Sequence, residues 1–152
     1  MTVKAIYFSI EEYVPPHIFE QRGDKAWELI DPRLIRTNDL LRSYFGTMII
    51  NTWHSESLSS TYGRRSWSGF RTAEFYRQRG DDDLAMFKRY DRSLSQHKFG
   101  RASDALFRDT TAAEVREYIL KNPSKFPDLT AIEDKVSWFH GDVRNTTRIK
   151  VF

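Results

Sequence analysis

The alternation of apolar and polar residues predicts its clearest helix near the end of the first quarter of the chain. Asp31-Pro32 has the sequence of an N-cap followed by proline at the first helical position. The apolar residues that follow recur with a period near 3.6, and Gly46 provides an end. We therefore predict a helix over 31–46. Residues 47–53 are rich in residues that favour extended structure, and they predict a strand.

The second half of the chain predicts one more well-marked helix and several strands. Thr111-Ala112-Ala113-Glu114 has the sequence of a capping box, and Asn122-Pro123 ends the apolar stripe that follows it. The segments expected to be strands are 102–107, 136–143 and 148–152. The last two are most simply an antiparallel hairpin. The expected fold class is α+β, with an antiparallel β-sheet covered by helices in a single domain spanning 1–152.

Three stretches are less regular. Residues 17–30 predict a turn or short helix, and residues 73–91 a short helix and a loop. Residues 55–72 are rich in Ser, Gly and Arg but also carry the large aromatic residues Tyr62, Trp67 and Phe70. Such a loop is either ordered against a cleft or simply tucked onto the core.

The amino-acid composition limits which metal ligands and which kinds of partner the chain can use. The chain has no cysteine, so any metal site must use His, Asp and Glu, and there are four histidines. A net charge of +3 predicts only weak attraction to anionic polymers. No apolar run approaches the roughly 20 residues of a membrane span, and the N-terminal residues do not resemble a signal peptide. We therefore expect synthesis in the cytoplasm without a signal peptide.

The candidate chemistry centres on His97 and Asp104, which are seven positions apart with Gly100 between them. A turn at Gly100 would fold the chain back so that the two side chains converge. His140 lies on the later predicted strand and is the third candidate ligand. Two imidazoles and a carboxylate suit zinc, and three protein ligands leave a fourth position for water or substrate. Singly, each residue is more often structural, as a satisfied histidine or an ion-paired aspartate.

Strand alternation places Trp138, His140 and Asp142 on one face of the later strand. Asp142 could orient the His140 ring or act on a water molecule. Alternatively, it is an aspartate that caps the turn before the next strand.

These residues resemble a known family. Ser95-x-His97-x-x-Gly100-x-Ala102-x-Asp104 resembles the SxHxxGxAxD signature of the zinc D-alanyl-D-alanine carboxypeptidase family of peptidoglycan peptidases. That family includes phage endolysins, and the hedgehog signalling domain is a structural relative. Ser68-Gly69-Phe70-Arg71 resembles the family's SG(Y/F)R motif, and Trp138–Asp142 resembles the branch whose last ligand motif reads HxD. The helix and strand over 31–53 resemble those that precede SGxR.

The resemblance implies a hedgehog or D-Ala-D-Ala-peptidase-like fold with zinc on His97, Asp104 and His140. It also implies that Arg71 faces the substrate carbonyl or carboxylate, where a fixed guanidinium stabilises negative charge. The alternative for Arg71 is a structural ion pair.

The sequence departs from the family pattern at the catalytic acid. Many members carry a carboxylate three residues before the last histidine ligand, where this chain has Ser137. We favour Glu133 as the base, because a carboxylate in the loop before the ligand strand can reach the open metal position. Asp134 is adjacent to it, and Asp142 is the second choice. The alternative is that Glu133-Asp134-Lys135 is only a solvated charged turn.

The function implied by the resemblance is zinc-dependent hydrolysis of peptidoglycan stem peptides, as a D,D-carboxypeptidase or an endopeptidase. A phage enzyme is expected, reaching the cell wall after release through a lysis pore or as part of a virion among other virion proteins. The alternative is a catalytically weak or inactive zinc-binding component of a phage tail or baseplate. A nucleic-acid binder ranks last, because the chain has no recognised binding motif and little net charge. Its candidate residues are Arg64, Arg65, Trp67, Arg71, Arg77 and Arg79.

Overall fold

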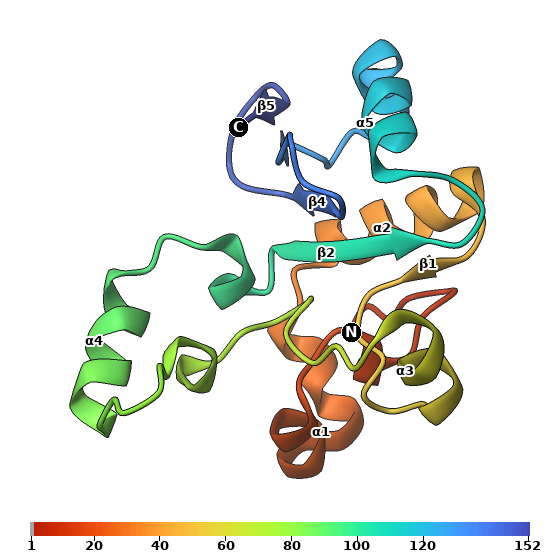
Figure 1. The fold of residues 1–152 in the computed structure, drawn as a ribbon. Coiled ribbons are helices and arrows are strands. Elements are labelled where there is room, and N and C mark those ends of the chain that lie inside the picture. Colours follow the sequence, from red (N-terminus) through yellow and green to blue (C-terminus); the bar gives the residue numbers. More distant parts are fainter. Residues whose placement is uncertain (1) are drawn as a thin grey trace.

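The computed structural model describes residues 2–152 and contains one five-stranded sheet with helices around it (Figure 1). The strands run in the order β1-β2-β4-β3-β5 across the sheet. Their bounds are β1 Met48–Ile49, β2 Ala102–Phe107, β3 Ala131–Ile132, β4 Phe139–Asp142 and β5 Lys150–Val151. The α-helices are α1 Pro16–Arg22, α2 Pro32–Phe45, α3 Glu56–Tyr62, α4 Asp83–Arg92 and α5 Ala112–Lys121. The predicted α+β class is therefore confirmed.

The sheet is mixed rather than wholly antiparallel. β2 pairs antiparallel with both β1 and β4, and β4 pairs antiparallel with β3, but β5 runs parallel to β3. The predicted hairpin between 136–143 and 148–152 is wrong. Because β4 already has β2 on one side and β3 on the other, β5 cannot pair with β4, and it joins the sheet at the edge of β3.

The later ligand strand is also shorter than predicted, because β4 begins at Phe139. The carbonyls of Val136 and Trp138 accept hydrogen bonds from the Arg116 guanidinium, at 3.0 Å each. These carbonyls are thus satisfied by a side chain of α5 rather than by a neighbouring strand.

The two best-marked helices form where the sequence predicts them. Asp31 caps α2 by accepting a hydrogen bond from the Arg33 amide, and Gly46 ends that helix with a φ of 80°. The Thr111 and Glu114 capping box begins α5. The strand expected at 47–53 is paired only over β1, since the Asn51 amide bonds to the Glu12 carbonyl.

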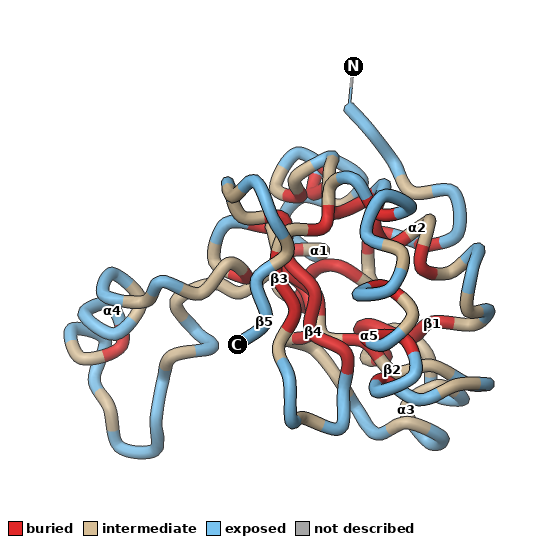
Figure 2. The backbone as a smooth tube through the Cα atoms, turned by 90° about the horizontal axis from the view of Figure 1, so that it is seen from above, coloured by how far each residue is buried: buried red, intermediate tan, exposed pale blue. Residues whose placement is uncertain are grey.

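The hydrophobic core lies between the sheet and the helices, and Figure 2 shows buried backbone concentrated at β3, β4 and the neighbouring segments. A buried polar chain crosses it: Asn38 of α2 donates to the Tyr13 hydroxyl and accepts from the Ser103 hydroxyl of β2. Since strand residues alternate in direction, Ser103 pointing towards α2 leaves Asp104 on the opposite face of the sheet.

The less regular stretches contain more helix than predicted. Residues 17–30 hold most of α1 and the 3-10 helix η2 (Gly23–Leu29), as expected for a short helix. The predicted loop at 55–72 contains α3, capped by Ser55. Residues 73–92 form the 3-10 helix η3 (Ala73–Tyr76) and α4, an excursion that stands away from the sheet in Figures 1 and 2.

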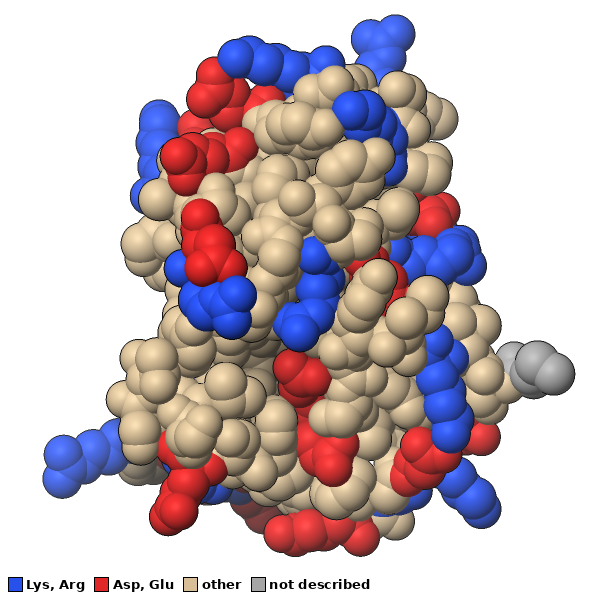
Figure 3. Space-filling view, turned by 90° about the vertical axis from the view of Figure 1, so that its right-hand side faces the viewer, with Lys and Arg blue, Asp and Glu red and all other residues tan. Residues whose placement is uncertain are grey.

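The surface charge is mixed. On the face in Figure 3, basic and acidic side chains are interspersed, without a large patch of one sign. Among residues 2–152, no helix has the length and apolar character that crossing a membrane requires.

Gly100 fixes the turn between the two first candidate ligands, and it can be tested by substitution. Its φ is +65°, and a Cβ there would lie 1.9 Å from the Leu29 carbonyl oxygen. Gly80 has a φ of +88° but open space around it. We expect Gly80→Ala to cost about 1–2 kcal/mol of unfolding free energy, from the left-handed backbone alone.

Gly100→Ala adds a steric clash with backbone, so we expect it to cost at least about 3 kcal/mol. Urea denaturation of both variants measures the difference. Equal losses would contradict the close packing of this turn on the segment before α2.

Candidate metal centre

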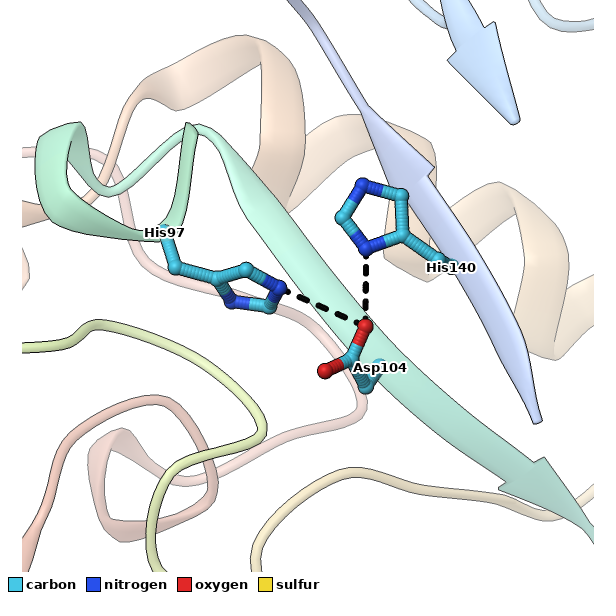
Figure 4. Close-up of side chains that lie close together, drawn as sticks. All are labelled: His97, Asp104 and His140. Carbon is cyan, nitrogen blue, oxygen red and sulfur yellow. Dashed lines mark hydrogen bonds and ion pairs between the residues drawn. The ribbon is translucent and has the colours of Figure 1, made fainter. Parts of the chain in front are cut away.

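Three side chains from separate segments converge on one face of the β2–β4 pair (Figure 4). They are His97, Asp104 and His140, and each offers a ligand atom within 4.8 Å of the others. Both histidines are buried, with His97 only 2% exposed and His140 7%. These three residues could hold a metal ion.

Strand pairing brings Asp104 and His140 together. The two residues are direct partners in the antiparallel register of β2 and β4. Side chains of such partners leave the same face of the sheet and lie close to each other. The Asp104 Oδ1 is 2.8 Å from the His140 Nδ1.

His97 reaches the same point from the 3-10 helix η4 (Gln96–Phe99) before β2. Gly100 ends η4 in the left-handed conformation, and its carbonyl accepts from the Asp31 amide at 3.0 Å. The His97 Nδ1 lies 2.7 Å from the Gly69 carbonyl oxygen, which can only accept, so Nδ1 carries the proton. The Nε2 lone pair therefore faces the Asp104 Oδ1 at 3.3 Å. Burial lowers the pKa of His97, which favours the neutral form that a metal ligand requires.

His140 lies between two carboxylates. Its Nε2 is 3.1 Å from the Asp142 Oδ2, and Asp142 is itself held by two hydrogen bonds from the Arg144 guanidinium. Burial lowers the His140 pKa, but the hydrogen bonds to Asp104 and Asp142 outweigh burial and raise it to about 9. The ring is therefore protonated on both nitrogens in the metal-free protein at neutral pH.

Asp104 is the shared acceptor. Burial raises its pKa, but the hydrogen bond from His140 outweighs that effect and holds the pKa well below the usual range. Its other oxygen accepts from the Arg71 guanidinium at 2.7 Å. A lone pair on His97 and a carboxylate oxygen that face each other repel unless a cation lies between them. A metal ion would supply that cation and displace the proton from the His140 Nδ1.

The three residues line an open pocket of about 360 Å³. Glu133 also lines it, directly after β3, with its amide bonded to the His140 carbonyl. No hydrogen bond or ion pair within residues 2–152 engages the Glu133 carboxylate. The remaining lining residues are Arg71, Leu94, Ser95, Gln96, Trp138, Arg144 and Phe152.

The other candidate acids are placed differently from Glu133. Asp142 is fully buried and bound to His140 and Arg144, and the Arg144 hydrogen bonds help hold its pKa at about 2 despite burial, which raises it. It therefore orients the His140 ring rather than facing the pocket. Asp134 is exposed near Arg116, outside the pocket lining, and Ser137 is exposed in the bend before β4.

Arg71 is both a pocket residue and a structural one. Its Nε donates to the Trp67 carbonyl at 2.7 Å, its Nη2 binds Asp104, and its guanidinium lies 4.1 Å from the Phe75 ring centre. The ion pair considered as its alternative role is thus present. A guanidinium held at three points is well placed to meet a substrate group without reorganisation.

The sequence did not single out several supporting residues. Arg144 holds Asp142, the Gly69 carbonyl fixes the His97 tautomer, and Arg65 donates to the Asp104 backbone carbonyl at 3.1 Å. Of these supporting residues, only Gly69 lies within a sequence motif, Ser68-Gly69-Phe70-Arg71. The contacts of Arg144 and Arg65 depend on tertiary positions that spacing along the chain does not reveal.

Comparison with known proteins adds no assignment, since no family model, curated protein or solved structure matches this chain.

The metal centre predicts one bound metal ion per chain. Elemental analysis of the purified protein should find it, and His97→Ala should abolish it because two ligands hold a metal weakly. His54→Ala is the control, since the His54 ring lies outside the site, against Trp53 and the Asn51 carbonyl. Metal content that is unchanged in His97→Ala would contradict the site.

The charges around His140 also predict how the free energy of unfolding of the metal-free protein depends on pH. The folded His140 pKa, about 9, exceeds its ordinary value of 6.5. The stability that protonated His140 gives to the folded protein is therefore fully present below about pH 6.5. It is lost as the pH rises through about 9. We expect the free energy of unfolding to fall by on the order of 3 kcal/mol over that window.

Two variants distinguish the effect of His140 on stability from that of a second titrating group, Glu12. Burial raises the Glu12 pKa to about 7, so its ionisation also lowers stability as the pH rises from 4.5 through 7. Denaturation of chelator-treated protein at several pH values should show that His140→Gln removes the loss above pH 7. Glu12→Gln should remove only the part below it. A loss above pH 7 that survives in His140→Gln would contradict the assignment.

Proposed function

We propose that the protein is a zinc-dependent peptidase that hydrolyses peptide bonds in peptidoglycan stem peptides. The observation that carries the proposal is the pocket itself, where three potential metal ligands, an unpaired carboxylate and a fixed guanidinium meet. The substrate class rests on the resemblance of Ser95–Asp104 and Ser68–Arg71 to the peptidoglycan peptidase signatures. These two segments lie together at the pocket, joined by the hydrogen bond from the Arg71 amide to the His97 carbonyl.

The donor set supports zinc among the common metals. Two imidazole nitrogens and one carboxylate oxygen form a ligand set typical of catalytic zinc, which keeps one position open. Tetrahedral zinc with bonds of about 2.0–2.1 Å separates its ligand atoms by roughly 3.3 Å. The His97 Nε2 and Asp104 Oδ1 are 3.3 Å apart, while the 2.8 Å between Asp104 and the His140 Nδ1 would widen slightly. When bound, zinc supplies Lewis acidity towards a carbonyl oxygen and towards water.

The protein side chains supply the remaining steps. Glu133 takes a proton from the attacking water and returns it to the leaving amine. Arg71 stabilises the negative charge that develops on the carbonyl oxygen. The side-chain oxygen of Gln96 is buried without a hydrogen-bond partner within residues 2–152. Gln96 is one of the residues that line the pocket, but this oxygen is not exposed to it.

We place this activity in a phage enzyme that acts on the cell wall during lysis or as part of a virion. This setting follows from the family resemblance alone. The second candidate is a zinc-binding structural component of a phage tail or baseplate. The observation that favours it is the absence of an acid at Ser137, together with an Arg71 that is already ion-paired to Asp104.

Glu133 separates the two candidates. We expect Glu133→Gln to lower the hydrolysis rate by roughly 10²–10⁴-fold, because the pocket loses its proton acceptor. Zinc content should be unchanged, since Glu133 is not a ligand. The assay counts new amino termini released from purified peptidoglycan.

Asp134→Asn is the matched control, because it removes the neighbouring charge from outside the pocket. It should behave like the parent protein. If the zinc-loaded parent releases no amino termini, the structural candidate stands and the peptidase proposal is wrong. If Glu133→Gln retains full activity, another group is the base.

A further inference from the structure

A second pocket lies beside the metal centre and shares lining residues with it. It is lined by Arg64, Arg65, Ser66, Trp67, Ser68, Arg71, Asp104 and Trp138. Three of these residues, Arg71, Asp104 and Trp138, also line the metal pocket. The two pockets are therefore adjacent, and a ligand that reaches the metal from one can extend into the other.

The charges of this second pocket are unbalanced. It contains three guanidinium groups and a single carboxylate, Asp104. That carboxylate is already bound by Arg71 and His140. The second pocket therefore has an excess of positive charge that its own residues do not neutralise.

Arg64 is the cation that remains available. Arg65 is used internally, donating to the Ile50 and Asp104 carbonyls, and Arg71 donates to Trp67 and Asp104. In contrast, no hydrogen bond or ion pair within residues 2–152 engages the Arg64 guanidinium. Arg64 is exposed at the rim, so it can meet an incoming anion without breaking an existing contact.

The walls of the pocket are aromatic. Trp67 is half-buried. The centre of its ring lies 5.7 Å from the centre of the His17 ring and 5.8 Å from the centre of the Phe75 ring. Trp138 is 37% exposed, and its backbone carbonyl is held by Arg116. Two positioned indoles can contact the aliphatic part of a bound residue while the guanidinium binds its charged end.

We propose that this second pocket is a carboxylate-binding subsite of the same peptidase, with Arg64 as a specificity-determining residue. This inference rests on the proposed function. The carboxylate comes either from the C-terminus of the stem peptide or from an acidic residue within it. The first source corresponds to removal of a terminal residue, and the second to cleavage inside the peptide.

Calorimetric binding of synthetic stem peptides tests the subsite without turnover. The protein is the zinc-loaded Glu133→Gln variant, either with or without Arg64→Gln. The peptides carry free carboxylates, an amidated C-terminus, amidated interior carboxylates, or both amidations. We expect the doubly amidated peptide to bind about fivefold to tenfold more weakly than the free acid. A loss of this size lies between that expected for an exposed ion pair and that expected for a partly desolvated one.

Arg64→Gln should weaken binding of the free acid to the same level and leave the doubly amidated peptide unchanged. The single amidation that reproduces the loss identifies which carboxylate the subsite binds. Arg79→Gln is the control, because Arg79 is exposed and lines neither pocket. Equal binding of acid and doubly amidated peptides, or equal effects of Arg64→Gln and Arg79→Gln, would overturn the subsite.

The binding and cleavage experiments can reject the subsite and the peptidase independently of each other. Arg64-dependent binding of the acid with no cleavage by the parent protein keeps the subsite and rejects the peptidase. Cleavage by the parent protein with no dependence of binding on Arg64 or on the carboxylate rejects the subsite and keeps the peptidase.

Discussion

The pairing of β2 with β4 is the constraint on which the candidate site depends. Its register sets Asp104 directly opposite His140, and the same register sets Ala105 opposite Phe139 in the core. Because side chains alternate along both strands, a slip of one residue would move the ligand pair into the core and core residues to the pocket. Core packing and site geometry are therefore specified by one set of strand contacts, and a change that shifts the register damages both.

The hydrogen bonds around the ligands add a second level of order. Gly69 and Asp142 each occupy one ring nitrogen of a histidine and leave the other directed at Asp104. Arg71 binds the Asp104 oxygen that faces away from the histidine rings, and Arg144 binds both oxygens of Asp142. Without a metal, the His140 Nδ1 carries a proton that is directed at Asp104, so metal and proton compete for the same nitrogen. Among residues 2–152, Glu133 is the one acid lining this pocket whose carboxylate has no hydrogen bond or ion pair, which is why the proposed chemistry depends on it.

Local signals predicted the parts of the fold that local interactions determine. The caps of α2 and α5 are satisfied by residues within a few positions, so the sequence located both helices. The parallel pairing of β5 could not be predicted, because it depends on which sheet edge is already occupied. The helix α3 was missed because its serine and threonine residues are weak helix formers, although the Ser55 cap was a usable signal.

In the candidate site, too, the sequence predicted the local features but not the tertiary contacts. Ligand types and the Gly100 turn could be inferred from spacing, and strand alternation placed Asp142 beside His140. The separation of Glu133 from Asp134, and the contacts made by Arg144 and Arg65, appear only in the folded chain.

Nitrogen-15 spectra of the four histidines, recorded while zinc is added to metal-free protein, test the central claim most directly. Zinc should shift the signals of the His97 Nε2 and the His140 Nδ1 and leave protons on the His97 Nδ1 and the His140 Nε2. The signals of His17 and His54 should stay unchanged. Binding of zinc through the opposite nitrogens, or shifts at His17 or His54 in place of His97 and His140, would contradict it.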